Sequence, residues 1–255
     1  MAAVLLAVAA CLSSCRSGYT VVGAEGRRIP LTAAFDSCPD TEAVRLLSPY
    51  REAVRSQMSA VIGRAARRLE SYRPESPLSD LLTDIIRQTA VRQTGTAIDV
   101  AVMNIGGIRN LLEEGDITVG NIYEVCPFEN RLAVVTLAGK DLSELFRQIA
   151  ATGGEGLSGA ELLLTNEGRL LRAMVGGHPI DPKAVYRVAT IDYVAEGNDR
   201  MEAFRQALSV RFLPGCLLRE SVMDYVKACT AEGRPVDAVT GRRIVVDDRE
   251  EGGDS

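Results

Sequence analysis

The chain has 255 residues, a formal net charge of −5, 46% hydrophobic residues and 25% charged residues. This balance indicates a folded globular protein of one large or two small domains, and it excludes a largely disordered chain. The acidic pI, near 5.2, argues against a nucleic-acid-binding protein, which normally has a basic face. The single histidine, His178, argues against a zinc enzyme or a His-liganded two-metal phosphatase, because such sites gather several imidazoles or thiolates.

Residues 1–14 begin with a short apolar stretch that ends in small residues. The stretch falls short of the about 20 apolar residues of a membrane-spanning helix and is typical of a secretory signal peptide. Residues 12–15 (LSSC) resemble a bacterial lipobox, which predicts cleavage before Cys15, lipidation of its thiol and export to the cell envelope. A second, weaker lipobox candidate ends at Cys11. A buried N-terminal helix or strand is the alternative, because no Lys or Arg precedes Cys15.

The cysteines after Cys15 are widely spaced, without a CxxC pair, which predicts neither a metal motif nor a redox motif. An exported chain meets an oxidising compartment, where disulfides are stable. Four cysteines allow three pairings and the sequence does not choose among them, so we expect free, mostly buried thiols. The residues are Cys38, Cys126, Cys216 and Cys229.

Residues 15–40 contain several Gly and Pro and predict a tether that leads into the fold. From Thr41 the apolar residues recur at intervals of three, four or seven, which predicts a helix with one apolar stripe. Pro49 predicts either a break in this helix or a new start with Ser48 as its N-cap. The stripe consists of Val44, Leu47, Val54, Met58 and Val61.

Arg64, Arg67 and Arg68 follow, and we expect them on a solvated helix face. A second helix is predicted to begin after Ser76, because Ser is a good N-cap residue and Pro77 suits the first helical position. Its buried face is expected to consist of Leu78, Leu81, Leu82, Ile85 and Ile86.

Residues 98–103 (IDVAVM) form a largely apolar run that suits a buried strand. Residues 166–168 (NEG) predict a tight turn and therefore a hairpin. The mixture of hairpins and helices indicates one α+β domain over residues 41–248, followed by a frayed acidic tail at residues 249–255. The remaining expected elements are strands at 132–137, 161–165, 170–175, 185–190 and 244–246, and helices at 141–151 and 220–231.

The strand at residues 98–103 runs directly into Asn104, Gly106, Gly107 and Arg109. Glycines after a buried strand allow a ligand to approach the backbone closely, and they expose N–H groups. Asn offers a donor and an acceptor, and the Arg fork suits a phosphate or carboxylate. The alternative is a plain strand–turn–helix corner, since short glycine patterns are common.

Read together with several later blocks, this corner strongly resembles the C-terminal domain of the 5′-nucleotidase family. The blocks follow the family's order over about residues 41–248. They are residues 75–84 (ESPLSDLLTD), 104–109 (NIGGIR), 115–118 (GDIT), 127–130 (PFEN), 137–142 (LAGKDL), 158–159 (SG), 180–190 (IDPKAVYRVAT) and 192–199 (DYVAEGND).

The resemblance implies a single four-layer α/β/β/α domain that binds the nucleoside part of a nucleotide. It implies that Phe128 and Tyr193 sandwich the base, that Asp199 accepts hydrogen bonds from ribose hydroxyls, that Asn104 contacts the base and that Arg109 contacts the phosphate. Two aromatic faces and a carboxylate also suit such a ligand on physical grounds. The substrate-binding residues carried over are Asn104, Gly106, Gly107, Arg109, Phe128, Tyr193 and Asp199.

The chain departs from the family pattern at three of these positions or close to them. Ile105 replaces the first of three glycines, and Tyr193 stands where the family usually has Phe. Tyr72 occupies the position of a family Arg, which leaves open whether Arg68 or Arg73 substitutes for it. Stacking survives a change from Phe to Tyr, because both side chains present an aromatic face.

The resemblance also implies that the chemistry belongs to a separate metallophosphoesterase domain with two metals. We therefore expect no catalytic residue, metal site or cofactor in this chain, with divalent metals on the partner, and we expect His178 in a solvent-exposed loop. The first hypothesis is a nucleotide-recognition module that supports nucleotide dephosphorylation outside the cytoplasm, with membrane contact through the lipid anchor alone. The second is a non-enzymatic nucleoside-binding lipoprotein for scavenging or sensing, and the third is a scaffold that keeps only the fold.

Overall fold

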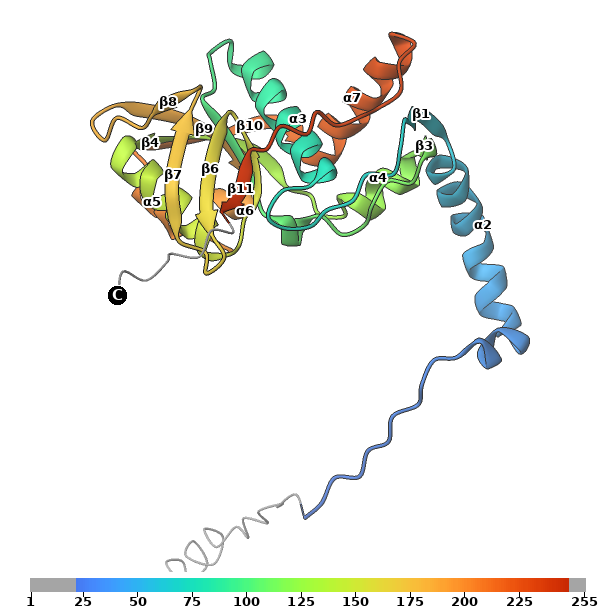
Figure 1. Cartoon of the computed structure of the whole chain (residues 1–255). Helices are drawn as coiled ribbons and strands as arrows, with labels where there is room; N and C mark the ends of the chain where they lie inside the picture. The colour runs from blue at the N-terminus through green and yellow to red at the C-terminus, as the bar shows by residue number, and fades with distance from the viewer. Residues whose placement is uncertain (1–21, 248–255) are drawn as a thin grey trace, which may run out of the picture. The chain divides into compact units, whose positions relative to one another are not determined.

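The computed structural model describes residues 22–247 (Figure 1), which fall into two compact units, residues 22–49 and 50–247. The predicted signal peptide, the lipidation site Cys15 and the acidic tail at 249–255 lie outside the described residues. Among the helices of the described part, none combines the length and the apolar character needed to cross a bilayer.

The first unit holds the short helix η1 (Ala33–Ser37) and the start of helix α2 (Thr41–Met58). Oδ1 of Asp40 accepts hydrogen bonds from the main-chain N–H groups of Glu42 and Ala43, both at 2.9 Å, which explains why the helix begins here. The predicted break or restart at Pro49 is wrong, because α2 runs through this residue. A proline removes one hydrogen bond of the ladder, and water can satisfy the freed carbonyl on an exposed helix.

The apolar stripe predicted for this helix does not continue through Val61. Val61 instead begins strand β1 (Val61–Ala65), which pairs antiparallel with β3 (Gly115–Thr118). A Cβ atom on Gly63 would lie 2.5 Å from Cγ1 of Val226, so β1 needs this glycine to pack against helix α7. The three arginines at positions 64, 67 and 68 are exposed as predicted, but they lie on β1 and the segment after it, not on a helix.

A five-stranded sheet forms the centre of the second unit. Its order is β10 (Ser209–Leu217), β4 (Arg131–Ala138), β9 (Val185–Ile191), β2 (Val100–Met103) and β5 (Gly156–Ser158). The β2–β9 pair is parallel and the other pairs are antiparallel. Every residue of β2 is buried, which confirms the buried strand predicted from its apolar run. Strand β10 has no counterpart among the predicted elements.

A second sheet has the order β11 (Ile244–Asp247), β6 (Ala160–Thr165), β7 (Leu170–Val175) and β8 (His178–Pro179). The hairpin predicted at residues 166–168 is confirmed, because β6 and β7 pair antiparallel across this turn. The last strand, β11, pairs parallel with β6.

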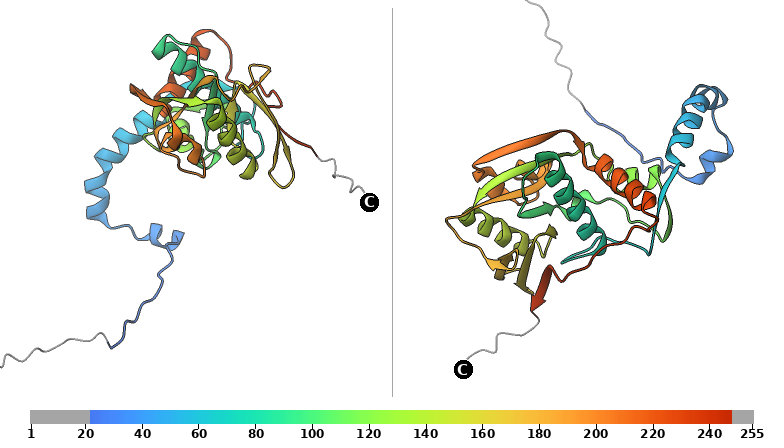
Figure 2. Two further views of the ribbon diagram at one scale, coloured as in Figure 1. Left: turned by 90° about the vertical axis from the view of Figure 1, so that its left-hand side faces the viewer. Right: turned by 90° about the horizontal axis from the view of Figure 1, so that it is seen from above.

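Helices α3 (Pro77–Thr94), α5 (Gly139–Ala151) and α7 (Leu218–Ala231) complete the core of this unit and can be followed in Figure 2. Helix α3 packs on β2, β5 and β9, α7 contacts α3, and α5 contacts strands of both sheets. The shorter helices are α4 (Val119–Val125), α6 (Asp192–Ala195), η2 (Ile105–Gly107) and η3 (Glu202–Gln206). Residues 50–247 thus form a mixed α/β domain, which confirms the predicted fold class.

The four cysteines of the described part are free, as expected. Cys126, Cys216 and Cys229 are buried, and Cys38 is exposed. Burial raises the pKa of the Cys126 thiol to about 12, despite the opposing charge of Arg219. A buried thiol that stays protonated acts as a small apolar group, so these cysteines serve packing.

Helix α3 begins after Ser76, as predicted, with Pro77 as its first residue. The Ser76 hydroxyl does not cap the helix; it lies 2.7 Å from the hydroxyl of Ser79, which donates to the Ser76 carbonyl oxygen at 2.9 Å. The start of the helix is therefore tied by hydroxyl contacts inside the protein, where both serines are buried.

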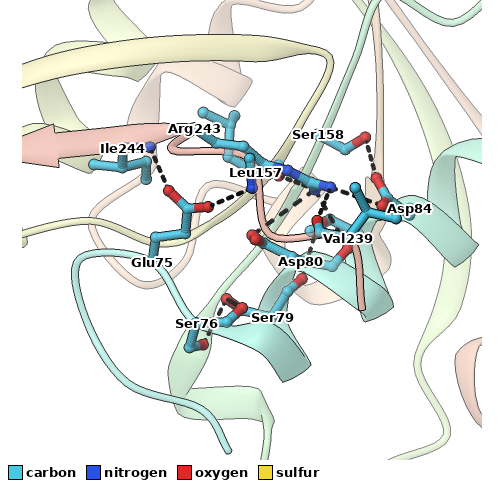
Figure 3. A network of polar contacts seen from close by, with 12 residues as sticks. Glu75, Ser76, Ser79, Asp80, Asp84, Leu157, Ser158, Val239, Arg243 and Ile244 are labelled. Atoms are coloured by element: carbon cyan, nitrogen blue, oxygen red, sulfur yellow. Dashed lines mark hydrogen bonds and ion pairs between the residues drawn. The ribbon is translucent and has the colours of Figure 1, made fainter. Parts of the chain in front are cut away.

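Polar contacts fasten the C-terminal segment to this helix (Figure 3). Nη2 of Arg243 donates to Oδ2 of Asp84 at 2.7 Å, and its Nη1 donates to the carbonyl oxygen of Leu157 at 2.7 Å. Oε2 of Glu75 accepts from the main-chain N–H of Ile244 at 2.9 Å. Because these groups hold the residues at the start of β11, they place this strand beside β6.

Asp80 lies at the centre of the same network and is buried. Burial raises the pKa of Asp80 to about 8, and the neighbouring carboxyl of Glu75 adds to this shift. The positive charge of Arg243 opposes this rise in pKa. Its guanidinium lies closer to Asp84, at 2.7 Å, than to Asp80, where Nη1 is 3.8 Å from Oδ1. Asp80 Oδ2 has no hydrogen-bond partner, which fits a carboxyl that is protonated at neutral pH.

Asp80→Asn should flatten the pH dependence of stability. The folded state keeps the Asp80 proton up to a higher pH than the unfolded chain, so the wild type loses stability between about pH 4 and 8, by at most about 1.4 kcal/mol per pH unit. Asn imitates the neutral carboxyl and avoids this loss. Urea unfolding at pH 5, 6, 7 and 8 should show a stability difference, variant minus wild type, that grows with pH.

The matched control for this series is Asp116→Asn, which removes an exposed carboxyl from β3. It should follow the wild-type profile. A difference between Asp80→Asn and the wild type that stays constant from pH 5 to 8 would contradict the assignment.

Candidate functional site

Six of the seven predicted binding residues line one pocket of about 470 Å³. They come from three parts of the second unit: the corner after β2, the loop between α4 and β4, and helix α6 with the loop after it. A volume of this size suits a small organic ligand. The lining residues are Asn104, Gly106, Gly107, Phe128, Asn130, Tyr193 and Asp199.

The corner after β2 brings an amide group to the pocket wall. Asn104 is only 4% exposed, and its Nδ2 donates to Oδ2 of Asp199 at 2.5 Å. A Cβ atom on Gly107 would lie 2.9 Å from Oδ1 of Asn104, so the corner needs a residue without a side chain there. Ile105 is accommodated in place of a glycine because its backbone is not in the left-handed region.

A buried carboxylate, that of Glu155, binds the backbone of the corner after β2. Glu155 is 2% exposed; its Oε2 accepts from the main-chain N–H of Ile105 at 2.6 Å, and its Oε1 pairs with the guanidinium of Arg73. Arg73 also donates from Nε to the Gly154 carbonyl oxygen at 2.8 Å. Sequence reasoning missed Glu155; a lone acidic residue in a glycine-rich stretch between a helix and a strand was the available signal.

Neither arginine that could substitute for the family Arg at the Tyr72 position reaches the pocket. Arg73 supports Glu155, as described, and Arg68 pairs with Glu70 at 2.8 Å and with Glu113 at 3.7 Å. Neither arginine is among the residues that line the pocket.

The loop that carries Phe128 rests on a buried arginine. Nη1 of Arg219 donates to the carbonyl oxygens of Cys126 at 3.4 Å and Pro127 at 3.1 Å, and its guanidinium lies 4.0 Å from the centre of the Tyr123 ring. These contacts fix the backbone directly before Phe128, whose ring is 49% exposed. The aromatic face is therefore held in place and open to a ligand.

Asn130 ends the same loop and lines the pocket, a contribution that sequence reasoning did not assign. Its main-chain oxygen accepts a hydrogen bond from the N–H of Leu218 at 2.9 Å, which ties the loop to the start of α7. It belongs to the block at residues 127–130, so that block was the signal that could have identified it.

The third wall of the pocket comes from α6 and the loop after it. Tyr193 is 43% exposed, and its hydroxyl donates to Oδ1 of Asp199 at 3.0 Å. Nδ2 of Asn198 donates to the Tyr193 carbonyl oxygen at 2.8 Å. Asp199 has φ +51°, a left-handed conformation that Asp tolerates better than most residues. The hydrogen bond to the Asp199 carboxylate raises the pKa of Tyr193, so the phenol keeps its proton at neutral pH.

Arg109 and His178 lie elsewhere. Nη1 of Arg109 donates to the carbonyl oxygen of Gly106 at 3.2 Å, so the guanidinium lies next to a pocket residue without lining the pocket itself. His178 is exposed as expected, but it lies on strand β8 and not in a loop. Within residues 22–247, no group of three or more His, Cys, Asp or Glu side chains is arranged to hold a metal ion.

The profile of the family described as 5′-nucleotidase, C-terminal domain, matches residues 57–206. The chain therefore belongs to this family, as the resemblance predicted. The match covers β1, α3, β2, both pocket loops and η3, so it includes every residue that lines the pocket.

Individual relatives agree with this assignment. Protein UshA of Escherichia coli K12 is 32% identical over 165 residues, which are 62% of this chain and 29% of UshA. Endonuclease YhcR of Bacillus subtilis is 31% identical over 210 residues, 77% of this chain and 17% of that protein. The crystal structure of a 5′-nucleotidase precursor from Thermus thermophilus has a TM-score of 0.70 and 31% identity, covering 82% of this chain and 44% of the other. The chain thus spans less than half the length of each of these relatives.

Proposed function

We propose that the pocket binds the nucleoside part of a nucleotide and that the chain serves as the nucleotide-recognition module of a 5′-nucleotidase. One observation carries the proposal: the half-exposed rings of Phe128 and Tyr193 line the same pocket as the Asp199 carboxylate. Aromatic faces bind a base by stacking, and a carboxylate accepts hydrogen bonds from sugar hydroxyls. Membership of the 5′-nucleotidase C-terminal domain family supports a role connected with nucleotides.

In this proposal the remaining polar groups orient the ligand. The side-chain amide of Asn130 offers a donor and an acceptor to the edge of the base, and Asn104 offers the second N–H of the amide that binds Asp199. Arg109, next to Gly106, supplies a cation for the phosphate at the pocket mouth. Gly106 and Gly107 keep side chains out of the space that the ligand needs.

Phe128→Ala should weaken binding of adenosine and AMP by roughly ten- to a hundredfold, because one stacked aromatic face contributes about 1–3 kcal/mol. Tyr193→Ala should have an effect of the same order. Titration calorimetry with the full chain measures both. Phe212→Ala, which removes a part-exposed ring of β10 that does not line the pocket, is the control and should bind as the wild type does. Unchanged affinity in both pocket variants would refute the site.

Removal of the phosphate is assigned to a separate metallophosphoesterase. Phosphate monoesters hydrolyse extremely slowly without a catalyst, and metallophosphatases overcome this with two ions that clamp the attacking and leaving oxygens. The whole sequence contains one histidine, which is too few imidazoles for a His-rich pair of metal sites. The divalent metals are therefore expected on the partner, and this chain is expected to bind the nucleotide.

The purified chain alone should release no phosphate from AMP with manganese, magnesium or zinc. A mixture with a metallophosphoesterase that co-purifies with the chain should release phosphate, and Asp199→Ala should reduce that rate. Metal-dependent turnover by the chain alone would contradict the assignment of phosphate removal to a separate protein. Nucleoside binding without any gain in turnover in the mixture would favour the alternative, a non-enzymatic nucleoside-binding lipoprotein for scavenging or sensing.

Export and lipid anchoring extend the proposal to the cell envelope. Support comes from the lipobox-like residues 12–15 and from the Thermus relative, which is described as a precursor. Mass spectrometry of the mature N-terminus should find an acylated Cys15. A mature chain that begins at Met1, or one cut elsewhere without acylation, would contradict the anchor.

A further inference from the structure

Asp199 enters the pocket with both carboxylate oxygens already engaged. Oδ1 accepts from the Tyr193 hydroxyl at 3.0 Å, and Oδ2 accepts from Nδ2 of Asn104 at 2.5 Å. The three residues come from the end of β2, from α6 and from the loop after α6. We refer to Asn104, Tyr193 and Asp199 together as the acceptor cluster.

The protons of this cluster determine what it offers to a ligand. A phenol has one hydroxyl proton, and Tyr193 donates it to Asp199. The phenol oxygen can therefore only accept a hydrogen bond from a ligand. The carboxylate has about four lone-pair positions, of which the protein uses two. The Tyr193 oxygen and the Asp199 carboxylate therefore present acceptors to the pocket, which match a ligand that brings hydroxyl donors.

Resting on the proposed function, we propose that the Tyr193 hydroxyl is a specificity-determining group that selects ribonucleosides over 2′-deoxyribonucleosides. The two vicinal hydroxyls of a ribose donate to two neighbouring acceptors, the Asp199 carboxylate and the Tyr193 oxygen. A 2′-deoxyribose lacks one of these donors and leaves one acceptor unpaired. Sites built to bind a hydroxyl reject analogues that lack it, because desolvating an unpaired polar group is costly.

The structure supports a dedicated role for this hydroxyl beyond stacking. A phenylalanine at position 193 would supply the same ring face to a base but no acceptor. Both partners of the hydroxyl bond are held independently, since Asn198 binds the Tyr193 carbonyl oxygen and Asn104 binds the other oxygen of Asp199. The tyrosine oxygen is therefore oriented before a ligand arrives, which reduces the entropic cost of binding.

The test compares adenosine with 2′-deoxyadenosine by titration calorimetry on the full chain. The wild type should bind adenosine about tenfold or more tightly than 2′-deoxyadenosine. Tyr193→Phe should weaken adenosine binding by about three- to tenfold while changing 2′-deoxyadenosine affinity by less than about twofold, so that the preference collapses. Asp199→Asn, which exchanges one acceptor oxygen for a donor group, should also reduce the preference.

Tyr50→Phe is the matched control, because it removes an exposed tyrosine hydroxyl that does not line the pocket, and it should leave the preference unchanged. An unaltered preference in Tyr193→Phe would overturn the inference and leave the proposed function intact. Equal weakening of both ligands would also overturn it, because the hydroxyl would then only position the ring. Failure of the wild type to bind either nucleoside would instead refute the proposed function.

Discussion

The hydrogen bond between the Asn104 amide and the Asp199 carboxylate is the contact on which the candidate site depends. It joins the end of β2 to the loop after α6, two segments separated by 95 residues in the sequence. Without it, Asp199 would lose its partner on Oδ2, and a carboxylate in a left-handed loop residue would have less to orient it. The Tyr193 hydroxyl donates to the same carboxylate, so this carboxylate connects the corner after β2 with the wall of the pocket formed by α6.

Other contacts of the domain fix the positions of the two segments that this bond joins. The parallel pairing of β2 with β9 brings Asn104 and the start of α6 to one end of the five-stranded sheet. Glu155 anchors the Ile105 peptide from the interior, and Arg219 anchors the loop before Phe128. Buried charges are costly unless they are paired, and here each holds the backbone next to a pocket residue. The side chains that line the pocket stand on loops and on α6, and the sheet and the buried charges next to them fix their positions.

Local sequence patterns predicted many of the helices and strands but few of the side-chain hydrogen bonds that build the site. The start of α3 at Pro77, the buried run of β2 and the turn at residues 166–168 follow from short-range rules, and the structure has them. The spacing of Val61 suits a helix, but the residue pairs with Thr118 of β3, and this long-range pairing makes it the start of a strand. Strand β10 was missed because Pro214 and Gly215 interrupt its pattern at the edge of the sheet, where the pairing with β4 is irregular.

Resemblance identified six of the pocket residues. The contact of Glu155 with the Ile105 peptide joins segments 50 residues apart, and no sequence spacing encodes it. The most direct test of the central claim is a crystal structure of the full chain with adenosine bound. We predict that the base lies against the rings of Phe128 and Tyr193 and that the ribose hydroxyls donate to the Asp199 carboxylate and the tyrosine oxygen. A nucleoside bound outside this pocket, or a ribose turned away from Asp199, would contradict it.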